Sequence, residues 1–511
     1  MTRAARLAVP VVKEIRGVWV AWLASVVVMV AAAVGGRQWS GVVLPAYFLG
    51  AAALGALSIG HEYSHHTITL LLSQPARRER LLLVKLGGLA AMLLALCAVA
   101  AVVLFEGNGI LRGFGSRRPE RAAVSVVLWL PVVYALFVAP SLTMLCRSPI
   151  AGAVFTMALP GLLLIAGELL GTAKYGYRSG TDGFRMAVLW WGTRGVCAVG
   201  AVAGWRMFMR LEAIDGPGPV VGLPQGLRRR SATSTAAPAF TKRRAMWLLA
   251  KKELRLQQLA LAVAGLYLFG WLTVVLLRHL GATEIGGAFS VLTILYSGLM
   301  AVLIGSLASA EERQLGTLEW QLLLPIATSK QWAAKAGMVL GLAMLLAIAF
   351  PLMLAVVHPI AHVGVRALFT TTVVLVIILL TAGSLYVSSL CASGLWALLM
   401  SLPALFGAAL YVKELSDRCH PWVWGLALGV SRRIGRQRLV SGIHLMPFDG
   451  ILALFVAGLL ALILRFGLTN HRSTDRAAGR VWTQAIWIAG CVTLGVVLLT
   501  ALDDLARLAA G

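Results

Sequence analysis

Long apolar stretches alternate with short polar ones along the whole chain. Each apolar stretch runs for about 18 to 23 residues, which lets a helix cross a hydrocarbon layer about 30 Å thick. Helices are expected because backbone groups in lipid must be hydrogen-bonded within the segment, and the stretches are too continuously apolar for barrel strands. The pattern predicts spans near residues 18–36, 42–60, 84–105, 122–145, 150–170 and 187–207, and again near 257–277, 286–309, 336–357, 367–390, 394–412 and 447–467.

The spans form two groups of six, separated by a segment rich in Gly, Pro, Ser and Arg, which is typical of a linker. One further apolar run, Val481–Leu502, lies outside both groups. We therefore expect an all-α polytopic membrane protein with 12 transmembrane helices as a 6+6 pseudo-repeat, and a thirteenth if the last run also spans. The expected parts are a first module at 1–211, a cytoplasmic linker at 212–241, a second module at 242–467, and a basic loop with the extra helix at 468–511.

Composition agrees with this fold class. Hydrophobic residues make up 59% of the chain and charged residues 13%, against about half and about a quarter in soluble domains. The net charge of +25 resides in loops, where Lys and Arg set topology and meet anionic headgroups, so nucleic acid is not an expected partner. The first span follows basic residues and lacks a signal-peptide cleavage site, which predicts a cytoplasmic N-terminus in the cytoplasmic membrane. The stretch 413–446 is expected to be an external loop, unless a short apolar piece such as Pro421–Val430 dips into the membrane.

A polar passage between the second and third spans occurs in both groups and keeps register at an offset of 250 residues. This offset is far longer than the repeats of solenoid proteins, and it indicates two copies of one membrane module. Glu62, Thr67, Pro75 and Lys85 of the first copy correspond to Glu312, Thr317, Pro325 and Lys335 of the second.

A second repeated motif precedes the first span of each group. Lys13, Glu14 and Arg16 of the first copy correspond to Lys252, Glu253 and Arg255 of the second. On a helical wheel the later segment has apolar residues on one side and basic residues on another. This pattern predicts helices that lie at the inner membrane surface, although a basic flank that merely ends a span fits equally well.

The polar passage resembles the cytoplasmic loop of ABC type-2 permeases, the membrane subunits of ATP-binding-cassette exporters. That loop contains an acidic residue, a Gly-Thr-Leu-Glu-like turn, a run of leucines, a proline and a lysine that opens the next helix. The first copy departs from the pattern at His66, in place of the glycine, and at Thr69, in place of the second glutamate. The resemblance covers about residues 1–467, and the second copy matches it with Glu312, Gly316, Thr317, Glu319, Pro325 and Lys335.

The resemblance implies an exporter permease that works by alternating access, with these loops and the interfacial segments resting on a separate ABC ATPase, one copy under each half. The chain is then no enzyme: it has no G-x-x-x-x-G-K-[ST] loop, so ATP and Mg are expected on the partner subunit. The loop carboxylates would pair with basic ATPase groups, and Lys85 and Lys335 would anchor the next span at the headgroups. The scarcity of charge within the spans favours a hydrophobic or amphipathic cargo.

Two other interpretations stay open. His61-Glu62-Tyr63-Ser64-His65 has the HExxH pattern of zinc proteases, in which His61 and His65 would bind the metal and Glu62 would act as general base. An intramembrane protease would take a third ligand from an element such as Pro447-Phe448-Asp449-Gly450, but only the acid of HExxH recurs in the second copy. An ATP-independent secondary transporter would need charged residues at mid-membrane. The candidates are Glu168 and Glu106, but a position at the outer headgroup boundary explains both of them better.

Overall fold

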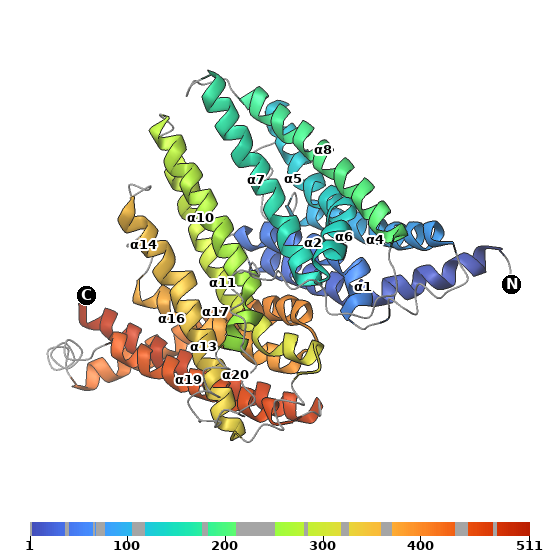
Figure 1. Ribbon diagram of the computed structural model, residues 1–511. Helices are drawn as coiled ribbons and strands as arrows, with labels where there is room; N and C mark the ends of the chain where they lie inside the picture. Colours follow the sequence, from blue (N-terminus) through green and yellow to red (C-terminus); the bar gives the residue numbers. More distant parts are fainter. Residues whose placement is uncertain are drawn as a thin grey trace, which may run out of the picture. The chain divides into compact units, whose positions relative to one another are not determined.

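The computed structural model describes residues 3–35, 40–64, 67, 77–104, 118–175, 182–210, 251–280, 285–317, 326–358, 370–434, 448–473 and 478–510. Every regular element in these ranges is a helix (Figure 1). The helices of the first half are α1 (Arg3–Val34), α2 (Ser40–Ser64), α4 (Arg78–Val102), α5 (Arg118–Phe137), α6 (Ala139–Cys146), α7 (Pro149–Tyr175) and α8 (Asp182–Met209).

The second half repeats this order of spans and adds one helix. Its third span is composite, since a π-helical turn η4 (Met344–Ala349) joins α13 (Thr328–Ala343) to α14 (Phe350–Val357). The other helices are α10 (Gln258–His279), α11 (Ile285–Gln314), α16 (Thr371–Leu390), α17 (Gly394–Ile434), α19 (Phe448–His471) and α20 (Ala478–Ala510).

Twelve described helices are long and apolar enough to cross a membrane, and a bent pair adds a thirteenth when it is counted as one span. The bent pair is the fourth span of the first half, where α5 and α6 meet at 41° next to Pro140. This result confirms the predicted all-α polytopic membrane protein. Each predicted span coincides with a helix or with a helix pair, and Val481–Leu502 lies within α20.

Helix α17 continues well beyond the predicted end of its span. It has 41 residues and is therefore about 60 Å long, roughly twice the thickness of the hydrocarbon layer. Residues 413–434, left as a loop by the sequence pattern, belong to this helix. Two ion pairs with i,i+4 spacing support its polar turns, Lys413 with Asp417 at 3.2 Å and Arg418 with Glu414 at 2.8 Å.

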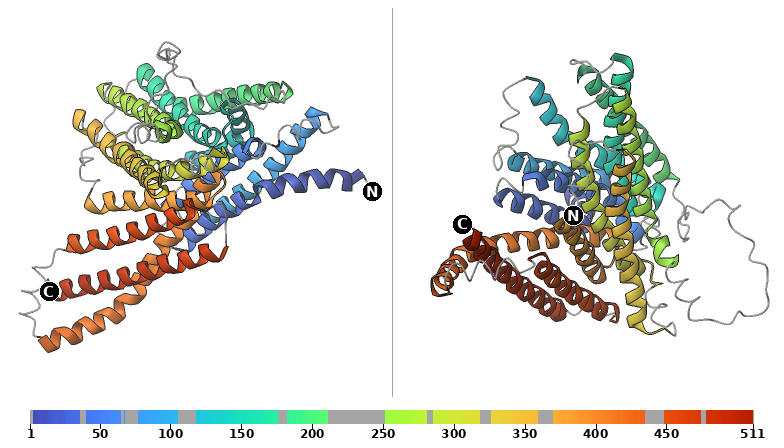
Figure 2. Two further views of the ribbon diagram at one scale, coloured as in Figure 1. Left: turned by 60° about the horizontal axis from the view of Figure 1, so that its bottom comes forward. Right: turned by 90° about the vertical axis from the view of Figure 1, so that its left-hand side faces the viewer.

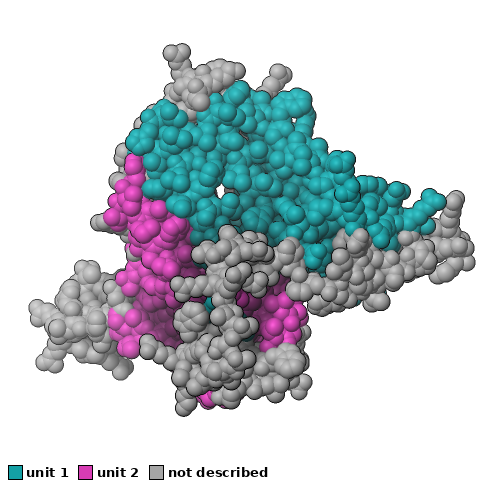
Figure 3. Space-filling view, viewed as in Figure 1, with its two compact units in different colours: residues 1–252, 258–291, 360–362 teal, residues 253–257, 292–359, 363–511 magenta. Residues whose placement is uncertain are grey.

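The chain divides into two compact units, which are coloured separately in Figure 3. Unit 1 comprises residues 1–252, 258–291 and 360–362, and unit 2 comprises residues 253–257, 292–359 and 363–511. Unit 1 thus includes α10, which packs against α7. The predicted linker at 212–241 lies outside the described residues, and the two-module division stays a prediction.

Helix α2 is the centre of unit 1, where it contacts α1, α4, α5, α6 and α7. A glycine permits its closest approach, because a Cβ atom on Gly55 would overlap the carbonyl oxygen of Ala135 on α5. In unit 2, Gly305 of α11 does the same against the carbonyl oxygen of Thr381 on α16. Small residues let membrane helices pack backbone to backbone. These two glycines keep the 250-residue offset, so the second and fourth spans pack alike in both halves.

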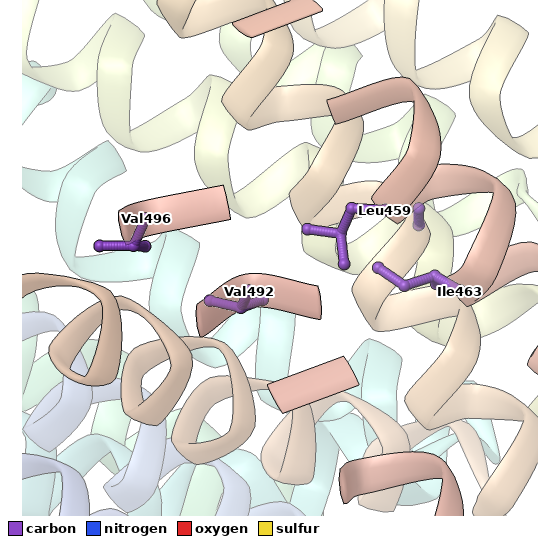
Figure 4. Packing of buried hydrophobic residues seen from close by; sticks show 5 residues of the cluster. Leu459, Ile463, Val492 and Val496 are labelled. Carbon is purple, nitrogen blue, oxygen red and sulfur yellow. The ribbon is translucent and has the colours of Figure 1, made fainter. Parts of the chain in front are cut away.

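Helix α20 is an integral part of unit 2. It packs along α17 and α19, and these three helices run side by side (Figure 2). Val492 and Val496 of α20 join Leu459 and Ile463 of α19 and Ala382 of α16 in one buried apolar cluster (Figure 4). The helix without a counterpart in the first half is therefore held by the same packing as its neighbours.

Candidate functional site

The end of α2 and the first turns of α4 are joined by a buried ion pair. The ammonium group of Lys85 lies 3.2 Å from Glu62 Oε1 and donates a hydrogen bond to the Ser58 carbonyl oxygen at 3.4 Å. Both charged side chains are buried, with Lys85 only 4% exposed. The loop between α2 and α4 is thus closed at its base by a charged contact inside the protein.

The second copy of the passage builds the same arrangement from the same positions. Lys335 of α13 pairs with Glu312 of α11 and donates to the Ala308 carbonyl oxygen at 3.1 Å. Lysine and glutamate are 23 residues apart in both copies, and lysine and its carbonyl acceptor are 27 apart. The sequence repeat is therefore a structural repeat as well.

This geometry differs from the roles expected for the two lysines. An ammonium group at the headgroups would be exposed, whereas Lys335 is 0% exposed and both lysines have internal partners. Burial of two opposite charges costs desolvation energy, which close pairing and additional hydrogen bonds offset. Each pair fixes the relative position of the two helices that flank its loop.

The two threonines hold their glutamates in different ways. Thr67 donates its hydroxyl proton to the Glu62 carboxylate, and its backbone N–H donates to the Glu62 carbonyl oxygen at 3.0 Å. Thr317 instead donates its hydroxyl proton to the Glu312 carbonyl oxygen at 3.3 Å. Both threonines therefore cap the last turn of the helix, but only Thr67 touches the charged group.

A third carboxylate approaches the second pair. Glu253, in the helical residues 251–256 that precede α10, is buried and lies 3.9 Å from Lys335 Nζ. One turn later, Gln257 donates to the Ile304 carbonyl oxygen of α11 at 3.0 Å. The predicted interfacial segment is thus attached to the base of the second loop, with Lys252 half-buried and Arg255 exposed.

The first interfacial segment is part of α1. Lys13 and Glu14 lie in this helix, but their side chains are outside the described residues, and Arg16 is exposed. Of the predicted loop residues, Pro75, Glu319 and Pro325 also lie outside the described part of the chain.

The described start of the second loop has an exposed apolar side chain. Leu315, directly after α11, is 60% exposed. The chain turns at Gly316, whose positive φ of 65° is a conformation that glycine adopts without strain. In the first copy the exposed residues at the start of α4 are charged: Arg77, Arg78, Glu79 and Arg80.

Arginine side chains brace the sixth span of each half, a feature that sequence reasoning missed. Arg78 donates to the Met209 carbonyl oxygen at the end of α8 at 2.6 Å, and Arg313 donates to the Asn470 carbonyl oxygen at the end of α19 at 3.1 Å. These carbonyls lack intrahelical partners and carry the negative end of the helix dipole. The sequence signal was an arginine inside each polar passage.

A polar cluster continues from Asn470 into the extra helix. The Asn470 side chain donates to Ser389 at 3.3 Å and exchanges hydrogen bonds of 3.1 Å with Gln484 of α20. Gln484 also accepts from Tyr386 at 3.0 Å and donates to Thr469 at 3.1 Å. The extra helix is therefore hydrogen-bonded to the C-terminal ends of α16 and α19, and Arg313 also bonds to the end of α19.

The residues of the zinc interpretation are only partly described. His61 is half-buried on α2, whereas His65 and Pro447 lie outside the described residues, and Phe448–Gly450 begin α19. Within the described residues, no group of three His, Cys, Asp or Glu side chains is close enough to hold a metal ion.

Glu168, one of the two candidate pathway residues, is in an ion pair. Its carboxylate lies 3.2 Å from Arg185 of α8, and both side chains are partly exposed. Glu106 lies outside the described residues.

No protein-family model, curated protein or solved structure matches the chain.

Proposed function

We propose that this multi-span helical membrane protein is the permease subunit of an ATP-driven ABC exporter, which moves a hydrophobic or amphipathic substrate across the cytoplasmic membrane. The observation that carries the proposal is the buried Glu–Lys pair at the base of each polar loop. Because the pair recurs with the same spacing in both halves, it is a feature of the repeated module. Two such modules suit a partner that binds as two copies.

The pairs give each loop a mechanical property that coupling requires. Glu62 with Lys85 joins the second span to the third, and Glu312 with Lys335 joins the corresponding spans of the second half. A force applied to either loop therefore moves two spans as one body. Rigid-body movement of helix pairs is a common route to opening and closing in transporters.

The buried carboxylates are not available to a partner, so the partner would contact the exposed loop residues. In the second copy these include Leu315 at the turn, and in the first they include Arg77, Glu79 and Arg80. ATP and Mg would be bound by the partner, which supplies the hydrolysis. This chain would contribute the docking surface, the pairs of spans that move as one body, and the substrate pathway between its spans.

The test begins with purification of the tagged chain from membranes of its own host. An ATPase should co-purify, and its activity should depend on the chain. Leu315→Asp should weaken the association by about tenfold or more, since a buried apolar contact becomes a desolvated charge. The matched control is Arg418→Ala on α17, an exposed residue far from the loop in sequence, which should leave association unchanged. Absence of any ATPase from the wild-type preparation would exclude the proposal.

A further inference from the structure

A cationic side chain lies between two tryptophans on the exposed side of α8. The guanidinium carbon of Arg194 is 5.0 Å from the ring centroid of Trp191 and 5.8 Å from that of Trp190. All three side chains are exposed, Trp190 by 45% and Trp191 by 69%. Positively charged groups are attracted to the faces of aromatic rings at such distances.

Arg194 lies deep along a membrane-spanning helix. Twelve residues separate it from Asp182, the first residue of α8, which corresponds to about 18 Å along the axis. About 22 Å separate it from Met209 at the other end. A charged group at this depth is expensive unless it has a partner, and it marks a functional site by default.

The other arginines of α8 avoid the cost of an unpaired charge deep in the membrane. Arg185 pairs with Glu168 of α7 at 3.2 Å, and Arg206 lies in the last turn, where headgroups and the helix dipole favour a cation. Among the described residues, no carboxylate forms an ion pair with Arg194. The described contacts of its guanidinium group are with the two rings, which cannot accept the five hydrogen bonds that a guanidinium donates.

We propose that Arg194, Trp190 and Trp191 bind the phosphate and glycerol region of an anionic phospholipid. An arginine side chain can bend towards the near headgroup layer while its stem stays in lipid, and its planar fork matches a phosphate group. Helix α8 is about 42 Å long, which exceeds the hydrocarbon layer by about 12 Å. With Met209 at one boundary of that layer, the other boundary falls about 20 residues earlier, next to Trp190 and Trp191, where indole rings are favoured. The site therefore takes a lipid at the Asp182 end of the helix.

The surface of α8 changes from charged at Arg194 to apolar further along the helix, as a lipid changes from its headgroup to its acyl chains. Exposed apolar residues continue along α8 away from the Asp182 end, with Val199 exposed by 70% and Val202 by 54%. An acyl chain that leaves a phosphate bound at Arg194 would run along these residues. A soluble phosphate ligand would gain nothing from them. The proposal concerns a lipid site and holds whether or not the chain is coupled to an ATPase.

The test measures lipid retention by native mass spectrometry. The purified chain is equilibrated with equal amounts of phosphatidylglycerol and phosphatidylcholine that carry identical acyl chains. The wild type should retain phosphatidylglycerol preferentially. Arg194→Gln should lower that preference by about fivefold or more, and Trp191→Ala by about two- to fivefold. The matched control Arg418→Gln removes one exposed arginine on α17 and should retain the wild-type preference.

Three outcomes would overturn the proposal. One is equal retention of phosphatidylglycerol by the wild type and by Arg194→Gln, with both proteins eluting as the same folded species. Another is an equal loss in the Arg418→Gln control, which would show a response to net charge. The third is full displacement of the lipid by millimolar glycerol phosphate, which would show that the site recognises phosphate alone.

Discussion

The Glu253 carboxylate lies 3.9 Å from the ammonium group of Lys335, although 82 residues separate the two in sequence. Lys335 already pairs with Glu312, so one buried cation faces two buried carboxylates. Through this lysine the segment before α10 is connected to both helices that flank the second loop. Since both the segment and the loop are expected to contact an ATPase, a single side chain would link the two contacts.

Substitution of Lys335 by methionine should destabilise the protein strongly. The change keeps the length of the side chain but leaves the Glu312 carboxylate buried without its cation, which typically costs about 3 to 5 kcal/mol. Thermal unfolding in detergent measures the effect. Lys85→Met in the first copy should behave in the same way, because Glu62 occupies the equivalent position. An unchanged unfolding temperature for both variants would contradict the internal role of these pairs.

The two carboxylates around Lys335 should not be equivalent. Glu312→Gln removes the closer charge and should cost about 3 to 5 kcal/mol of stability. Glu253→Gln keeps the shape of the side chain and leaves the Lys335–Glu312 pair intact, and Glu253 is the more distant of the two carboxylates, so its cost should be smaller. Unfolding of both variants under one set of conditions decides the order. A larger loss for Glu253→Gln would show that Glu253 is the principal partner of the lysine.

The spans could be predicted from the sequence because a membrane helix is determined largely by its own composition. The polar end of α17 was missed for the same reason, since Lys413, Glu414, Asp417 and Arg418 interrupt the apolar pattern. Their i,i+4 spacing supports a helix that the hydropathy pattern alone does not reveal.

The sequence identified the residues of the Glu–Lys pairs but assigned them to outside partners. Whether Glu62 meets Lys85 depends on how α2 and α4 rotate against each other, and hydropathy does not determine that rotation. A signal was nevertheless present. An acid and a lysine recurred together at a constant spacing of 23 residues, which is better explained by contact with each other than by two separate external roles.

The close approach of α11 to α16 predicts a penalty at Gly305. A glycine in a helix usually costs about 1 kcal/mol relative to alanine, so Gly→Ala should stabilise where space allows. Gly341 of α13 has such space, because no atom lies within 4 Å of an added Cβ. At Gly305 the methyl group would overlap the Thr381 carbonyl oxygen and the Leu385 amide nitrogen. Gly305→Ala should therefore lower the unfolding temperature while Gly341→Ala leaves it equal or higher, and equal shifts would refute the close packing.

Gln484 should be the residue through which α20 stabilises the C-terminal ends of α16 and α19. Replacing it with leucine would leave Asn470 and Tyr386 without a hydrogen-bond partner that they have in the structure, at a cost of about 1 to 3 kcal/mol. The neighbouring Thr483→Val provides the control, because that exposed hydroxyl bonds only within its own helix, to the Gly479 carbonyl oxygen. Hydrogen exchange of the α19 C-terminus should accelerate in Gln484→Leu and not in Thr483→Val. Equal exchange in the two variants would mean that the polar cluster does not hold this end, and that apolar packing against α17 and α19 is sufficient to anchor α20.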